Sequence, residues 1–198
     1  MLAHHIHHAL AQVQELQARI LEKQRFKGYS GRARALSGTL ALLGAIAMGS
    51  STYPATTTAH LAGWGAVFVI AFLLNYGALM YWFLFDPGVN RDWRRLKPVA
   101  DVAPPLVVGG VFTLALVLRE HHDYLVGTWM CLFGLANLAS RHVLPRAICW
   151  VGLFYLLTGA GCLLWPNLTF INPWPMGLIF FIGEWTGGLI LHFDGTRK

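Results

Sequence analysis

The side chain best placed to carry out chemistry is a glutamate inside an apolar stretch near the C-terminus. Glu184 lies in the middle of residues 175–193, within the sequence GEWTGG. An ionisable group at bilayer depth is costly, so such a residue is first considered functional. His192 follows two helical turns later on the same face, near the end of the stretch. The two residues could belong to a proton path, or Glu184 could be protonated and donate one hydrogen bond to a neighbouring helix.

Small residues surround this glutamate at helical spacing. Gly183 and Gly187 are four residues apart, as are Glu184 and Gly188. Glycines at this spacing let a second helix approach closely. We therefore expect Gly183, Gly187 and Gly188 to pack against a helix, and Glu184 to lie in that contact. Asn75, inside another apolar stretch, is a further intramembrane candidate that can hydrogen-bond across a bundle.

Histidines offer two weaker candidate sites. His4 and His8 are four residues apart and could clamp a transition metal on one face of a helix, although a simple surface histidine run fits as well. A membrane haem usually needs two axial histidines from facing helices. The haem candidates form one pair at each end of the predicted spans and sit at or beyond the span ends: His60, His122, His142 and His192. The sequence leaves open whether any cofactor binds.

The elements that would hold these residues are six apolar stretches. The 198-residue chain is 56% hydrophobic and only 12% charged, against roughly 25% charged residues in soluble domains. A membrane span needs about 20 mainly apolar residues. The predicted spans are residues 35–53, 60–85, 103–118, 124–139, 147–165 and 175–193.

The basic residues give these spans an orientation. Fourteen of the 15 lysines and arginines fall in the N-terminal segment, the connections after the second and fourth spans, and the C-terminal tail, whereas Arg119 alone falls on the other side. Basic residues mark the cytoplasmic side of a membrane protein. The distribution therefore predicts an integral protein, of a bacterial inner membrane, with both termini cytoplasmic. It also explains the net charge of +6 without nucleic acid.

Residues 1–34 are predicted to be a cytoplasmic amphipathic, basic segment. Residues 2–27 carry apolar side chains at helical spacing. Such a helix can lie on anionic lipid or pair with a helix of a partner or of a second copy. Residues 35–198 would then form the transmembrane domain.

Taken together, these patterns predict an all-α polytopic membrane protein, with about six transmembrane helices preceded by an amphipathic cytoplasmic helix. The sequence has no nucleotide-binding loop and no metalloprotease or hydrolase signature. We therefore expect a non-enzymatic accessory or scaffold subunit of a membrane complex. The alternatives are an oligomeric channel or proton-linked transporter with Glu184 on its path, and a haem- or quinone-linked electron-transfer subunit.

Overall fold

The computed structural model describes residues 12–13, 16, 28–87, 96–142 and 144–196. Within these ranges there are six α-helices and no strand, so the predicted all-α fold is confirmed for the described part of the chain. The predicted helix over residues 2–27 lies almost entirely outside it. The helices are α2 (Gly31–Met48), α3 (Thr57–Phe85), α4 (Lys97–Leu118), α5 (Leu125–Ala139), α6 (Ile148–Leu164) and α7 (Trp174–Thr196), with short 3₁₀ helices η2 (His122–Tyr124) and η3 (Ser140–His142) flanking α5.

Polar caps explain where the first two of these helices begin. The Ser30 hydroxyl accepts a hydrogen bond from the Ala33 backbone N–H and starts α2 four residues before the predicted span. The Thr56 hydroxyl accepts in the same way from Ala59 at the start of α3. Such caps satisfy backbone N–H groups that have no partner inside the helix. Because α2 begins at Gly31, Arg34 lies in the first turn of this helix.

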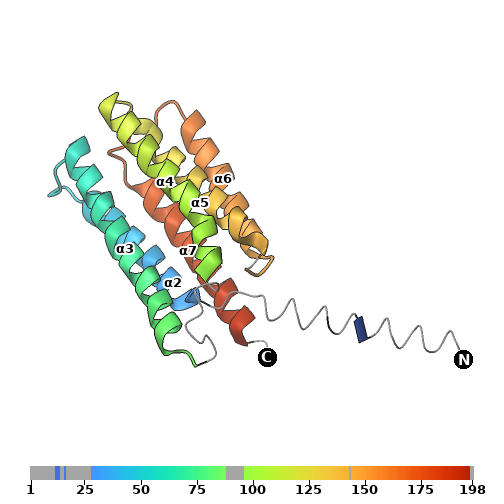
Figure 1. The fold of residues 1–198 in the computed structure, drawn as a ribbon. Coiled ribbons are helices and arrows are strands. Elements are labelled where there is room, and N and C mark those ends of the chain that lie inside the picture. Colours follow the sequence, from blue (N-terminus) through green and yellow to red (C-terminus); the bar gives the residue numbers. More distant parts are fainter. Residues whose placement is uncertain (1–11, 14–15, 17–27, 88–95, 143, 197–198) are drawn as a thin grey trace, which may run out of the picture.

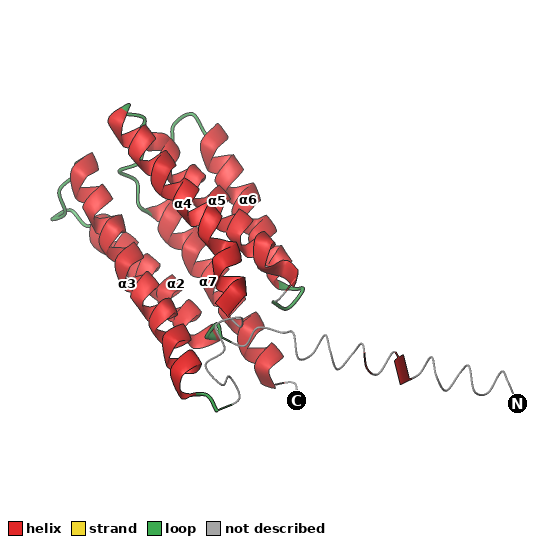
Figure 2. Ribbon diagram, in the orientation of Figure 1, coloured by secondary structure: helices red, strands yellow, loops and turns green. Residues whose placement is uncertain are grey.

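The helices form an up-and-down bundle in which consecutive helices run antiparallel (Figure 1). α2 makes its most extensive contact with α7, and α5 with α6, while α4 packs on α5 and α3 on α2. Helices account for nearly all of the bundle, with loops only at its two ends (Figure 2). The bundle therefore consists of two tightly packed antiparallel pairs, with α3 and α4 added beside them.

Glycines let the backbones of α5 and α6 touch. A Cβ atom added to Gly127 would lie 2.7 Å from the carbonyl oxygen of Gly159. About two turns further along α5, a Cβ on Gly134 would lie 2.8 Å from the carbonyl oxygen of Gly152. Contacts this short leave no room for any side chain, so glycine at these positions sets the distance between the two helices.

Two glycines of α6 give a matched test of this packing. We expect Gly159→Ala to lower the free energy of unfolding by about 1–3 kcal/mol, because its Cβ would lie 2.8 Å from the Cys131 sulfur and 2.9 Å from the Gly127 oxygen. Gly161→Ala meets nothing within 4 Å and should be neutral or stabilising by up to about 1 kcal/mol, because alanine is the better helix former. Equilibrium unfolding followed by circular dichroism measures both; equal losses would contradict the close contact.

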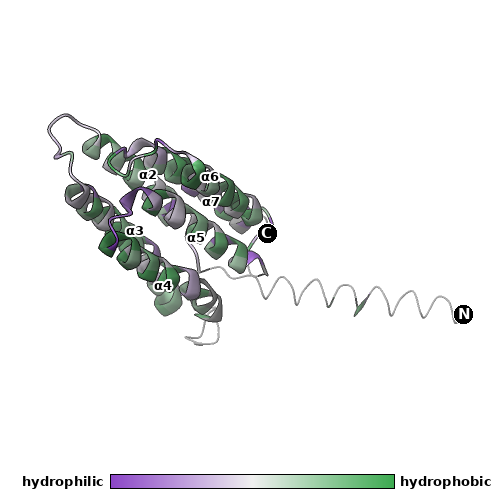
Figure 3. Ribbon diagram, turned by 90° about the horizontal axis from the view of Figure 1, so that it is seen from above, coloured by the Kyte–Doolittle hydropathy of each residue, from purple (hydrophilic) through white to green (hydrophobic). Residues whose placement is uncertain are grey.

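The outer surface of the bundle is unusually apolar. Of the 29 residues of α3, four are buried: His60, Trp64, Leu79 and Phe83. Hydrophobic residues cover most of α3 and α4 (Figure 3). α3 and residues Trp174–Asp194 of α7 are long and apolar enough to cross a membrane, and Ala103–Leu118 and Ile148–Leu164 are shorter apolar helical segments.

Candidate functional site

Four helices meet at a buried polar cluster around Glu184. We use the name Glu184 cluster for Arg34 of α2, Asn137 of α5, Tyr155 of α6 and Glu184 of α7. Arg34 is 8% exposed and Glu184 6%, and Tyr155 is fully buried. Charged side chains are almost never this buried unless they are paired. The cluster thus joins both of the tightly packed helix pairs at one place.

The hydrogen bonds of the cluster converge on one carboxylate oxygen. Arg34 donates to Glu184 Oε1 from Nη2 at 2.9 Å and from Nε at 3.2 Å. Tyr155 donates its hydroxyl proton to the same oxygen at 3.1 Å. Arg34 Nη2 also donates to Asn137 Oδ1 at 2.7 Å, and the Asn137 amide nitrogen donates to the Phe133 carbonyl at 2.9 Å. Each named member of the cluster therefore has a protein partner.

Three glycines make room for these long side chains. A Cβ on Gly183 would collide with the Tyr155 ring, and one on Gly187 would lie 2.6 Å from the Arg34 guanidinium carbon. On the opposite helix, a Cβ on Gly38 would lie 2.9 Å from the Glu184 Cβ. Gly188 has a different neighbour, because it lies against the Gly31 carbonyl and Ala35 of α2. The glycines beside Glu184 thus leave space for the Tyr155 ring, the Arg34 guanidinium group and the backbone of α2.

The chemistry open to the cluster follows from its charges. A guanidinium stays protonated in proteins. Protonating Glu184 would therefore leave the Arg34 cation buried without a counter-charge, which is the costly way to break a buried ion pair. The buried ion pair between Arg34 and Glu184 therefore links α2 to α7.

Asn75 forms a second polar link, between α3 and α2. Its amide nitrogen donates to Ser37 Oγ at 2.7 Å and to the Ala71 carbonyl at 2.9 Å. The Ser37 hydroxyl in turn donates to the Ala33 carbonyl at 3.0 Å. Because Ser37 lies one turn after Arg34, this link borders the Glu184 cluster.

The predicted histidine candidates lie in separate places. His192 is exposed on α7, about 12 Å along the helix axis from Glu184 at roughly 1.5 Å per residue. The structure therefore brings Arg34, and not His192, to Glu184. His60 is buried in the first turn of α3, and His122 is half-buried in η2. His142 lies in η3, and nothing is described of its side chain, while His4 and His8 fall outside the described residues.

No metal centre is formed by the part of the chain that the structure describes. There, no group of three or more histidine, cysteine, aspartate or glutamate side chains could hold a metal ion. Glu184 can be predicted from the sequence, whereas its two closest partners, Arg34 and Tyr155, are not among the predicted site residues. Arg34 was counted with the cytoplasmic basic residues, and Tyr155 has nothing local to distinguish it. One signal was available for Arg34: it begins a helical stripe of buried, mostly small residues that continues through Gly38, Ala41, Ala45 and Met48.

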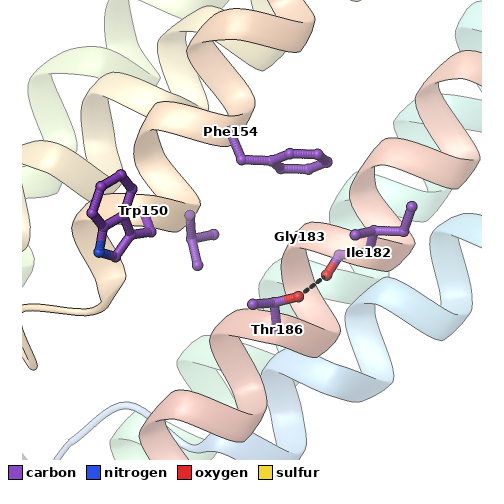
Figure 4. A pocket seen from close by; sticks show the side chains of 6 residues that line it. Trp150, Phe154, Ile182, Gly183 and Thr186 are labelled. Atoms are coloured by element: carbon purple, nitrogen blue, oxygen red, sulfur yellow. Dashed lines mark hydrogen bonds between the residues drawn. The ribbon is translucent and has the colours of Figure 1, made fainter.

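Two hollows lie on the sides of the bundle. A pocket of about 170 Å³ opens between α6 and α7, lined by Trp150, Phe154, Ile182 and Thr186 among others (Figure 4). An open groove of about 470 Å³ separates α3 from α4, with Phe72 and Tyr76 on one wall. Both are almost wholly apolar, and neither is lined by Arg34 or Glu184.

Comparison with known proteins found no relative of this chain. No protein family matches the chain, and neither a curated protein nor a solved structure matches it.

Proposed function

We propose that this chain is a polytopic integral membrane protein that acts as a non-enzymatic accessory or scaffold subunit of a membrane complex. In this proposal α2 to α7 all cross the bilayer and both termini are cytoplasmic. The exposed apolar side chains of α3 and α4 support the membrane assignment, since soluble proteins rarely expose apolar patches of this extent.

The helix lengths support six crossings. At about 1.5 Å per residue, the 18 residues of α2 and the 17 of α6 extend close to the roughly 30 Å of a hydrocarbon core. The shorter α5 is continued at both ends by η2 and η3, so that residues 122–142 are helical throughout. The start of α2, the start of α4 and the connection between α5 and α6 lie at the same end of the bundle (Figure 1). Arg32, Lys97, Arg141 and Arg146 belong to that end, as the cytoplasmic side requires.

The observation that carries the accessory role is the convergence of three hydrogen bonds on one carboxylate oxygen of Glu184. Three donors already occupy Glu184 Oε1, and the donors come from two other helices. In an oligomeric channel or proton-linked transporter, Glu184 would exchange a proton and leave Arg34 unpaired. A haem- or quinone-linked subunit would instead need a ligand or ring site that the cluster does not offer. Holding helices together is the function that fits these contacts.

The surface left for a partner is the side formed by α3 and α4. α3 packs mainly on α2, and the open groove separates it from α4. Large apolar side chains that no other helix covers lie along both: Phe68, Leu73, Val111 and Leu114 are each about half exposed or more. We propose that a transmembrane segment of the complex contacts this side.

Site-specific photo-crosslinking in native membranes tests the proposal. A photoreactive phenylalanine analogue replaces Leu73 of α3, and the matched control replaces Leu157 of α6, since the two are 63% and 65% exposed. We expect Leu73 to give one dominant protein adduct and Leu157 to give lipid adducts. Lipid adducts at both positions, together with proton flux that is abolished by Glu184→Gln in reconstituted vesicles, would overturn the accessory role in favour of transport.

A further inference from the structure

Two buried polar atoms at the N-terminal end of α3 have no hydrogen-bond partner. They are His60 Nε2 and Trp64 Nε1, and they are the only buried side-chain nitrogen or oxygen atoms without a partner in the part of the chain that the structure describes. Both residues are 2% exposed. Unsatisfied groups of this kind are rare in native proteins, where buried polar atoms bond to protein groups or to ordered water. Because residues four apart share one face of a helix, the two atoms belong to the same side of α3.

The hydrogen-bonding character of each atom can be assigned. His60 Nδ1 lies 3.0 Å from the Thr56 carbonyl oxygen. A carbonyl only accepts, so Nδ1 carries the proton, and Nε2 of the neutral ring is left as an acceptor. The Trp64 indole nitrogen is a donor only. One unsatisfied acceptor and one unsatisfied donor therefore belong to residues that are one helical turn apart.

The acceptor at His60 Nε2 and the donor at Trp64 Nε1 determine which kind of ligand can bind to both atoms. A cation would satisfy His60 Nε2 but would be repelled by the Trp64 N–H. An anion would accept from Trp64 but could not bind the lone pair of His60. A small neutral molecule that donates one hydrogen bond and accepts another satisfies both atoms, and water is the smallest such molecule.

His60 and Trp64 are surrounded by other side chains of the bundle, since both are 2% exposed. Trp64 belongs to the hydrophobic core together with Met48, Phe170 and Met176. The Tyr53 ring stands edge-on against the His60 ring, with centroids 5.3 Å apart. Gly63 lets both Tyr53 and Met48 approach α3, since a Cβ there would lie 2.8 Å from the Tyr53 hydroxyl. The side chains of Tyr53 and Met48 therefore lie close to the helix turn that carries His60 and Trp64.

We propose that His60 and Trp64 bind one internal water molecule, which accepts from Trp64 Nε1–H and donates to His60 Nε2. The water would fasten the N-terminal end of α3 to the core, as the Asn75–Ser37 bond does further along the helix. This water would therefore help to fix the helix that we propose carries the partner surface. The site itself does not depend on that function.

Nuclear magnetic resonance of the full chain in detergent, labelled with ¹⁵N in tryptophan and histidine, tests the proposal. The Trp64 indole signal is assigned by its loss in Trp64→Phe. We expect a cross-peak between this N–H and a long-lived water, and a His60 Nε2 signal typical of an unprotonated, hydrogen-bonded nitrogen. The cross-peak should disappear in His60→Phe and persist in His60→Gln, which keeps an acceptor.

Three results would overturn the proposal. A Trp64 N–H without a water cross-peak in the native protein would mean a dry site. A cross-peak that His60→Phe leaves unchanged would mean that the water is held by other groups. A Trp64 N–H signal that shifts on chloride titration, with His60 protonated at both nitrogens, would mean an anion site. The first and third results come from the native protein, so they do not depend on whether His60→Phe folds.

Discussion

Arg34→Met should lower the free energy of unfolding by about 3–5 kcal/mol, the usual cost of removing one partner from a buried ion pair. The substitution leaves Glu184 without the two hydrogen bonds from Arg34 Nε and Nη2. It also removes the donor to Asn137 Oδ1. Methionine keeps much of the length and apolar bulk of arginine, so the loss reports on charge and hydrogen bonding rather than on a cavity. Reversible unfolding in mixed micelles, followed by circular dichroism, measures it.

Arg32→Met is the matched control, because it makes the same change two residues earlier at an exposed position. We expect it to stay within about 0.5 kcal/mol of the native chain. Arg34→Met combined with Glu184→Met should recover most of the lost stability, since an apolar pair often replaces a buried ion pair at little cost. If Arg34→Met is as mild as Arg32→Met, the cluster does not hold the helices together. If the double variant is stable but abolishes a proton flux that the native chain supports, the transport alternative is favoured.

The all-α fold could be predicted because the signals for it are local. Each apolar stretch can be recognised from its own residues, and five of the six predicted spans end within about three residues of a described helix end. The starts are less regular: α4 begins at Lys97, six residues before the predicted span, with a proline at its N-terminus. Proline is tolerated in the first turn, where its missing N–H costs nothing. A hydropathy pattern does not detect a helix start of this kind, because the charged residues Lys97 and Asp101 interrupt the apolar stretch.

The candidate site could be predicted only in part. Glu184 stands out because its own neighbours are apolar, whereas its partner Arg34 is 150 residues away and looks like one more basic residue before a span. Helical periodicity places His192 on the same face as Glu184 but says nothing of where the neighbouring helix ends. α2 begins at Gly31, which lies against Gly188 and the backbone nitrogen of His192. The imidazole is therefore at the edge of the α2–α7 contact and is exposed.

Gly188→Leu should cost about 3 kcal/mol, at the upper end of the range for overpacking. Its Cβ would lie 2.6 Å from the Gly31 carbonyl oxygen and 3.2 Å from the Ala35 Cβ, so the first contact is with backbone that cannot rotate away. Relief requires α2 and α7 to separate. Their contact is the most extensive in the described bundle, and separation would also lengthen the bonds between Arg34 and Glu184 one turn away.

Thr186→Leu adds bulk to the exposed side of the same helix, two residues earlier, and serves as the control. We expect the free energy of unfolding to change by no more than about 0.5 kcal/mol, measured by the same unfolding experiment.

A combination of Gly188→Leu with Arg34→Met separates the contribution of the α2–α7 contact from that of the Glu184 cluster. If separation of the helices already breaks the ion pair, the double variant should lose less stability than the sum of the single losses, because the two sites act on one contact. Additive losses would mean that the helix contact and the Glu184 cluster stabilise the bundle independently, and that α7 can move from α2 near Gly188 while Arg34 keeps its carboxylate.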